Sequence, residues 1–286
     1  MKIFAVLGDP ISHSLSPVMQ NTALNALGLD AQYLSFRVAK ENLRYAVLGA
    51  QAMGFSGLNL TIPLKEIALK IVIPDDLARA IGAVNTISFG GDAKEEIKGY
   101  NTDSFGALMA LERTGIKIED SRALIIGAGG ASRAIAYILS LRGAKVSIAN
   151  RSQARAVELA NRVGGHGFGL DDLGKLVPRA DILINATSVG MKEGDPRLID
   201  QSWLRPGQIV FDTIYNRRTE LLEDAFRAKA VAIDGVTMLV YQGAKALEIW
   251  TGLKAPVDVM ERAVRGALEE REKAKICLNK DQLKEQ

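Results

Sequence analysis

One stretch of the sequence decides the fold: Ala123-Leu124-Ile125-Ile126-Gly127-Ala128-Gly129-Gly130-Ala131-Ser132-Arg133-Ala134. A short apolar run leads directly into glycines, and a helix-forming segment follows them. This order predicts a strand, a tight turn and a helix whose free N–H groups and positive dipole end face a pyrophosphate. Ser132 takes the place of the third glycine of G-x-G-x-x-G, but it is small enough for close packing. The alternative is a structural turn of small residues, and the flanking strand and helix favour the dinucleotide site.

The rest of the chain continues the alternation of strands and helices. Apolar runs predict strands at 3–8, 33–38, 57–61, 84–89, 96–101, 123–126, 145–149, 181–185, 209–212 and 231–234. Apolar spacings of three and four predict helices at 17–27, 41–53, 64–72, 104–114, 132–141, 153–163, 219–229, 238–251 and 257–272. Residues 276–286 are polar without a period and read as a frayed tail.

This order predicts an α/β fold of two domains with a cleft between them. The first has a mostly parallel sheet and comprises residues 1–103 plus 237–286, because the C-terminal helices return to it. The second, residues 104–236, is Rossmann-like and carries the glycine turn.

The charge balance of the sequence bears on whether nucleic acids or membranes are binding partners. The chain has 286 residues, with 36 Lys and Arg against 33 Asp and Glu, and no charged block, which argues against nucleic acid and anionic membranes. The single Cys277 cannot form an intramolecular disulfide, and one cysteine with two histidines offers no metal site. No signal-peptide core and no run of ~18 apolar residues is present, so we expect a cytoplasmic protein. Monomer and homodimer both stay open.

The residues after the strand at 145–149 bear on the choice of cofactor. NAD-binding sites usually place a carboxylate there to accept from the ribose 2′-OH. This chain has Asn150, Arg151 and Ser152, with Arg155 one turn later. Guanidinium groups favour the 2′-phosphate of NADP. The arginines could instead be a solvated surface, but cations near a helix start oppose its dipole unless an anion binds there.

Polar residues gather where strands of the first domain should end, in the stretches 8–17, 59–65, 83–86 and 99–103. Such strand ends are where open α/β sheets bind ligands. Each residue also has a structural reading. Ser16 before Pro17 and Asp103 could be helix caps, Lys65 a solvated lysine and His13 a turn residue. These readings do not explain why so many uncharged polar groups accumulate beside one lysine and one aspartate.

These stretches, with 127–131, 150–152, 185–191 and 238–243, resemble the ordered motifs of the shikimate dehydrogenase family. The resemblance implies NADP-dependent, reversible reduction of 3-dehydroshikimate to shikimate, on the route to chorismate and the aromatic amino acids. A quinate/shikimate dehydrogenase that uses NAD or both cofactors is an alternative within the enzymes. A non-catalytic module that senses NADP or a hydroxy acid is the alternative outside them.

The resemblance also implies roles for individual residues. Lys65 and Asp103 would be the catalytic pair. The substrate would be held by Ser14, Ser16 and Tyr215 at its carboxylate, and by Asn59, Thr61, Asn85 and Gln242 at its hydroxyls. NADP would meet Gly127, Ala128, Gly129, Gly130 and Ala131 at the pyrophosphate, Asn150, Arg151, Ser152 and Arg155 at the 2′-phosphate, and Thr187, Ser188, Gly235 and Met238 elsewhere, the last two at the nicotinamide.

The chemistry suits the residue types. Negative charge develops on the carbonyl oxygen as hydride arrives, and the Lys65 ammonium can stabilise it and donate the proton. Asp103 would orient that ammonium, so we expect the two to lie close in space.

The chain departs from the family pattern twice. Gln20 stands where the family has histidine, which we expect to affect packing. The loop from Asp212 to Thr219 looks one residue short, which bears on the placement of Tyr215.

Overall fold

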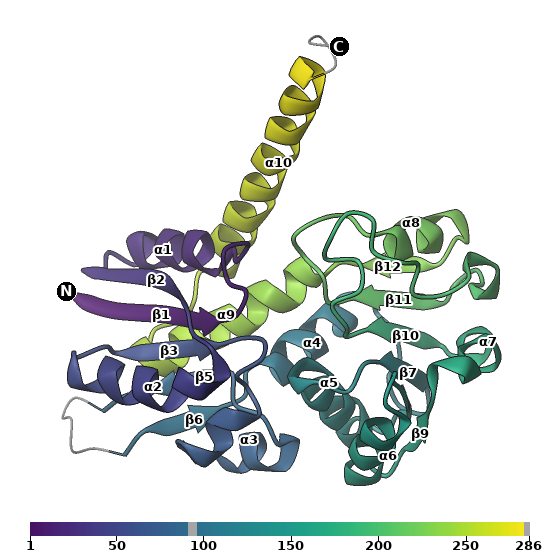
Figure 1. The fold of residues 1–286 in the computed structure, drawn as a ribbon, viewed down its shortest axis with the longest axis horizontal. Helices are drawn as coiled ribbons and strands as arrows, with labels where there is room; N and C mark the ends of the chain where they lie inside the picture. Colours follow the sequence, from purple (N-terminus) through teal and green to yellow (C-terminus); the bar gives the residue numbers. More distant parts are fainter. Residues whose placement is uncertain (91–95, 283–286) are drawn as a thin grey trace.

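The chain forms two six-stranded sheets, one from each half of the sequence (Figure 1). The computed structural model describes residues 1–90 and 96–282, with side chains through residue 274. Helices interleave with the strands throughout, which confirms the predicted two-domain α/β class.

The first sheet has the strand order β2-β1-β3-β5-β6-β4. Its strands are β1 (Lys2–Gly8), β2 (Ala31–Arg37), β3 (Gly57–Leu60), β4 (Ile73–Pro74), β5 (Thr86–Ser88) and β6 (Lys98–Tyr100). Strand β1 is parallel to β2 and β3, and β4 is parallel to β6, whereas β5 is antiparallel to both of its neighbours. The carboxyl ends of β1 and β3 therefore open at the same edge as the loop that leads into β5.

The second sheet is parallel throughout, in the order β12-β11-β10-β7-β8-β9. Its strands are β7 (Arg122–Ile126), β8 (Lys145–Ala149), β9 (His166–Phe168), β10 (Ile182–Asn185), β11 (Ile209–Asp212) and β12 (Val231–Ile233). This is the strand order of a doubly wound dinucleotide fold, in which the order of the strands reverses between the first and the fourth strand of the sheet. That reversal lies between β7 and β10, where the glycine turn follows β7.

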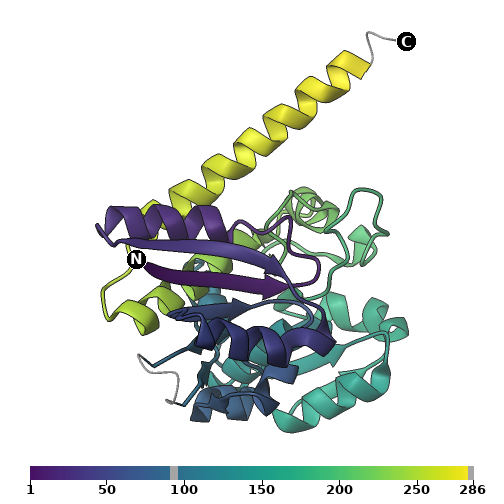
Figure 2. The same cartoon turned by 60° about the vertical axis from the view of Figure 1, so that its left-hand side comes forward.

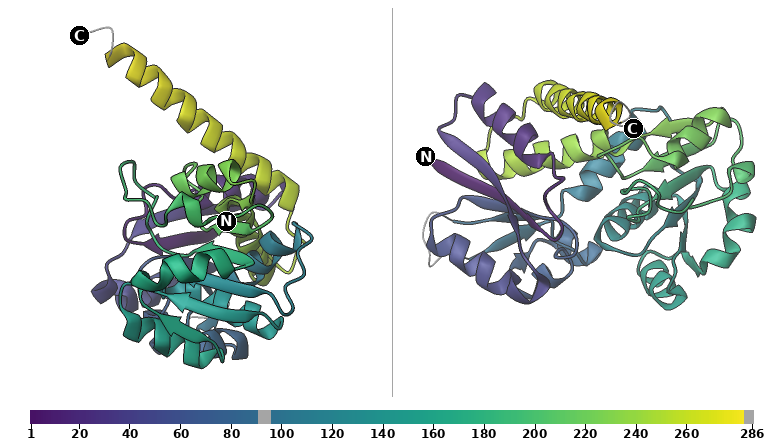
Figure 3. Two further views of the ribbon diagram at one scale, coloured as in Figure 1. Left: turned by 90° about the vertical axis from the view of Figure 1, so that its right-hand side faces the viewer. Right: turned by 45° about the horizontal axis from the view of Figure 1, so that its top comes forward.

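Two helices, α4 and α9, lie between the sheets (Figure 1). The helices are α1 (Ser16–Ala26), α2 (Leu43–Ala52), α3 (Asp76–Ile81), α4 (Asp103–Glu112), α5 (Gly130–Leu141), α6 (Gln153–Arg162), α7 (Leu173–Leu176), α8 (Glu220–Arg227), α9 (Gly235–Thr251) and α10 (Val257–Gln282). Short 3₁₀ turns are η1 (Lys40–Asn42), η2 (Ile67–Lys70), η3 (Leu170–Asp172), η4 (Val177–Arg179) and η5 (Gln201–Trp203). Helix α4 packs against α5 and the second sheet, and most of α9 packs with α10 against β1 and α1. The C-terminal helices thus return to the first sheet (Figure 3).

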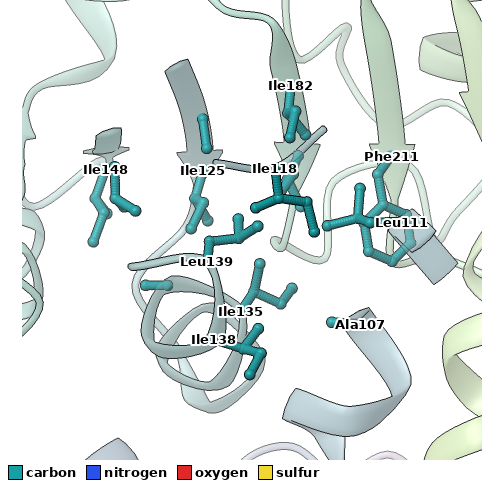
Figure 4. Close-up of a cluster of buried hydrophobic side chains, with 14 of the residues drawn as sticks. Ala107, Leu111, Ile118, Ile125, Ile135, Ile138, Leu139, Ile148, Ile182 and Phe211 are labelled. Atoms are coloured by element: carbon teal, nitrogen blue, oxygen red, sulfur yellow. The ribbon is translucent and has the colours of Figure 1, made fainter. Parts of the chain in front are cut away.

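The apolar core beneath the glycine turn fixes the position of α5. Ile135 and Leu139 of α5 pack against Ile125 of β7 and Ile148 of β8, and all four side chains are fully buried (Figure 4). Burial of such side chains contributes roughly 1.5–3 kcal/mol each, which holds the start of α5 at the end of β7.

The predicted helix at 64–72 is wrong, because only the 3₁₀ turn η2 forms there. The Lys65 carbonyl accepts from Val84 N–H at 2.9 Å, so part of this backbone is used in a tertiary contact rather than a helical ladder. The short elements β4, β9, α3 and α7 were not predicted, since two to six residues carry too little periodicity to detect.

The predicted frayed tail is also wrong over most of its length. Helix α10 continues through Gln282 and projects away from both sheets (Figure 2), and only 283–286 of that prediction lie outside the described residues. The sequence 276–282 therefore continues a helix that residues 257–268 anchor by packing.

Candidate active site

Lys65 and Asp103 form an ion pair beyond the carboxyl end of strand β3 in the first sheet. The Lys65 Nζ donates to Asp103 Oδ2 at 2.6 Å, and the side chains are 13% and 5% exposed. Lys65 follows β3 and Asp103 opens α4, so their predicted proximity is confirmed. The capping interpretation of Asp103 is wrong, since its carboxylate bonds Lys65 and Asn85 instead of capping α4. Lys65 is likewise not a solvated surface lysine.

Asn85 joins this pair to its surroundings. Its side-chain amide donates to Asp103 Oδ1 and to the Thr102 hydroxyl, both at 2.9 Å, and to Gln242 Oε1 at 3.3 Å. Its side-chain oxygen accepts from the Thr102 backbone N–H at 2.8 Å. Asp103 is therefore held by partners on both oxygens, and Gln242 of α9 is brought to the same point.

A second polar group surrounds Asn59. Its Oδ1 accepts from the Tyr33 hydroxyl at 2.7 Å, and its amide donates to Thr86 Oγ1 at 3.0 Å. Thr61 lies two residues further on and is half-buried beside Gly8. Sequence reasoning missed Tyr33, because an apolar strand position reads as core. Its near-complete burial and its bond to Asn59 place it beneath the site.

Ser14 and Ser16 lie where the loop after β1 leads into α1, beyond the carboxyl end of β1. Ser16 is the first residue of α1 rather than its N-cap, so the capping interpretation of Ser16 is wrong, and its backbone N–H donates to Ser14 Oγ at 3.3 Å. Tyr215, which follows β11, packs against the apolar cluster that contains Leu15 of this loop. Burial raises the pKa of Tyr215, and the Ser14 side chain opposes that rise. The short loop after β11 therefore still brings Tyr215 against the core beside this loop.

The glycine turn has the form that a pyrophosphate requires. Gly127 has φ +116°, and a Cβ there would lie 2.7 Å from the Ala186 carbonyl, so only glycine fits between β7 and β10. A Cβ on Gly129 would meet nothing within 4 Å, which leaves open space before α5. Ser132 Oγ accepts from Gly129 N–H at 3.3 Å and closes the turn. The N–H groups of the first helical turn have no intrahelical acceptor and suit an anion.

The residues after β8 include two exposed side chains and one arginine that bonds the glycine turn. Arg151 and Ser152 are exposed, and Arg151 makes no ion pair with any side chain that the structure describes. Asn150 donates to the Ser152 carbonyl at 3.0 Å. Arg155 instead donates to the Ala128 carbonyl at 3.1 Å, which holds it over the glycine turn. Its charge and that of Arg151 can both face a 2′-phosphate.

Glu66 is a charged residue that sequence reasoning missed. Its carboxylate lies 3.3 Å from Arg133 of α5 and 3.4 Å from Arg155, and so links the first domain to the glycine turn. Arg133 is 9% exposed and its Nε lacks a hydrogen-bond partner within the described residues. Only its place beside Lys65 could have indicated Glu66.

The remaining predicted cofactor residues line the carboxyl end of the second sheet. The Thr187 hydroxyl donates to Asn185 Oδ1 at 2.7 Å and accepts from Val189 N–H, so it shapes the loop after β10. Ser188 is exposed. Gly235 and Met238 are buried in α9, and a Cβ on Gly235 would lie 2.3 Å from the Thr213 carbonyl.

Gln20 has the packing effect that we expected. It is fully buried in α1, and its amide donates to the Gly243 carbonyl of α9 at 2.9 Å. This bond lies next to Gln242 and helps to set the position of α9.

Comparison with known proteins identifies the family. Three family models match: "Shikimate dehydrogenase substrate binding domain" at 6–87, "Shikimate / quinate 5-dehydrogenase" at 109–192 and "Shikimate 5'-dehydrogenase C-terminal domain" at 235–265. A shikimate dehydrogenase (NADP(+)) of Methanothrix thermoacetophila is 58% identical over 268 residues, which cover 94% of this chain and 98% of that protein. The chain belongs to the shikimate dehydrogenase family.

Solved structures of the family agree with this fold. The enzyme of Aquifex aeolicus has a TM-score of 0.88 at 37% identity and covers 93% of this chain and 98% of its own. The enzyme of Thermus thermophilus, solved with NADP(H) and shikimate, has a TM-score of 0.84 at 37% identity and covers 93% and 100%. Among the described residues of the present chain, no helix has the length and apolarity to cross a membrane.

Proposed function

We propose that this protein is an NADP-dependent shikimate dehydrogenase that reduces 3-dehydroshikimate to shikimate and also catalyses the reverse reaction. The 2.6 Å contact between Lys65 and Asp103 carries the proposal. It places one ammonium among uncharged hydrogen-bonding groups that suit a polyhydroxylated ring. The family membership and the NADP(+) name of the Methanothrix relative support the same assignment.

Lys65 has the capacity to bind and protonate the substrate carbonyl oxygen. An ammonium has three donors, and Asp103 uses one, so the others remain for that oxygen. As negative charge develops there, the fixed positive charge in this partly buried place stabilises it. Asp103 cannot turn away, since Asn85 holds its other oxygen.

NADPH supplies the hydride when bound. The open space at Gly129 and the free charge of Arg151 fit its pyrophosphate and 2′-phosphate. Ser14, Ser16 and Tyr215 would hold the substrate carboxylate, and Asn59, Thr61, Asn85 and Gln242 its hydroxyls. Residues 1–103 plus 237–286 would form the substrate domain and 104–236 the NADP domain, in a cytoplasmic enzyme.

An absorbance assay at the nicotinamide band tests the proposal. We expect shikimate and NADP⁺ to give rapid NADPH formation, with a much lower kcat/KM for NAD⁺ and for quinate. A clear preference for NAD⁺ would contradict the role of Arg151. Binding of shikimate and NADP⁺ without any turnover would instead indicate a sensing module.

A further inference from the structure

An arginine of α10 reaches the loop that carries Ser14. The Nη1 of Arg271 donates to the carbonyl oxygen of His13 at 3.0 Å. Helix α10 also packs along α1, which begins at Ser16. The same helix therefore contacts both the loop that carries Ser14 (the serine loop) and the helix that follows this loop.

The charge of Arg271 is not neutralised within its own helix. Residues three and four positions away on a helix are neighbours, and here they are alanine, leucine, alanine and lysine. The adjacent Glu270 and Glu272 form no ion pair with Arg271 among the side chains that the structure describes. A positive charge thus remains beside the loop.

Two groups that border Ser14 respond to this charge. Arg271 opposes the burial-induced rise in the pKa of Tyr215, and together with burial it lowers the pKa of His13. These effects agree with the position of the guanidinium beside the His13 carbonyl, within electrostatic range of both groups.

The groups expected at the substrate carboxylate are all neutral hydroxyls. Ser14, Ser16 and Tyr215 can donate hydrogen bonds to an anion, but none of them carries a compensating charge. The C-terminal family model matches residues 235–265, so Arg271 lies outside the matched segment.

We propose that Arg271 is a positioning residue that favours carboxylate substrates: it holds the serine loop through His13 and supplies the positive charge that the hydroxyls lack. This inference rests on the proposed function. It predicts an effect on acidic substrates that is separate from any effect on the chemical step.

Steady-state kinetics of Arg271→Gln and Arg271→Lys test the proposal, with shikimate and its methyl ester as substrates. Arg262→Gln is the matched control, because Arg262 is an exposed arginine on the same helix. The glutamine variant should raise the KM for shikimate about 1.5- to fivefold, the range for an exposed charge pair. Its kcat and its KM for NADP⁺ should stay unchanged, and its KM for the ester should rise much less than its KM for shikimate. The lysine variant should restore most of the wild-type KM.

A dependence on salt provides a second readout. Added salt should raise the KM for shikimate in the wild type and in Arg262→Gln, but little in Arg271→Gln, since screening acts on the missing charge. Equal increases in KM for the acid and the ester, or no increase for either, would overturn the proposal. If the wild type does not oxidise shikimate, the proposed function fails, and calorimetric binding of shikimate to the same variants still decides the role of Arg271.

Discussion

The buried carboxyl of Asp212 makes the stability of this protein depend on pH in a definite direction. Asp212 ends β11 with no exposed surface. Burial raises its pKa from 3.8 to about 6, although bonds from Thr219, Ile214 N–H and Asn185 oppose the rise. We expect Asp212→Asn, which stays neutral at every pH, to remove this contribution.

The sign follows from linkage. A carboxyl with a raised pKa in the folded state contributes stability that is fully present below pH 3.8 and is lost as pH rises through about 6. A shift of about two units corresponds to about 3 kcal/mol, at 1.36 kcal/mol per unit. Because pH 4 already lies just above 3.8, the unfolding free energy of Asp212→Asn should rise relative to that of the wild type by about 2 kcal/mol between pH 4 and pH 7.

Urea unfolding, followed by circular dichroism from pH 4 to pH 7 for Asp212→Asn and below pH 4 for the control, measures the difference. Asp195→Asn is a control of opposite sign, because backbone N–H groups of Lys192 and Gly190 lower the pKa of that carboxylate. Its difference from the wild type should shrink as the pH falls through the lowered pKa. A pH-independent difference for Asp212→Asn would refute the reasoning.

Three further substitutions test the site and the core. Lys65→Met should lower kcat by roughly 10²–10⁴-fold with little change in the KM for shikimate, and an unchanged kcat would remove its proposed role. Arg151→Glu should raise the KM for NADPH far more than that for 3-dehydroshikimate, and equal effects would count against a 2′-phosphate contact. Gly57→Ala should lower the melting temperature, because its Cβ would lie 2.2 Å from Trp250 Nε1, and such overpacking costs about 1–3 kcal/mol.

Local patterns predicted much of the fold. The apolar run before Gly127 and the helix after it follow from propensity, and β7 and α5 lie close to the predicted bounds. Segment 64–72 was mispredicted because the contact between the Lys65 carbonyl and Val84 N–H joins positions far apart in sequence. The motif stretches 59–65 and 99–103 predicted Lys65 and Asp103 as the catalytic pair. Glu66 and Arg271 were not predicted, because their contacts, with Arg133 and Arg155 and with His13, join positions far apart in the sequence.

Helix α9 has a consequence for how the two ligands must meet. The residue expected at the nicotinamide, Met238, and the residue expected at the substrate ring, Gln242, are four positions apart on this one helix. They are therefore separated by about 6 Å along its axis. A Cβ on Gly106 of α4 would lie 2.5 Å from the Met238 carbonyl, so the helix is also held closely from the side. Because both positions lie on one helix, their own separation stays fixed when the domains open or close, so α9 is a common reference for the two ligands.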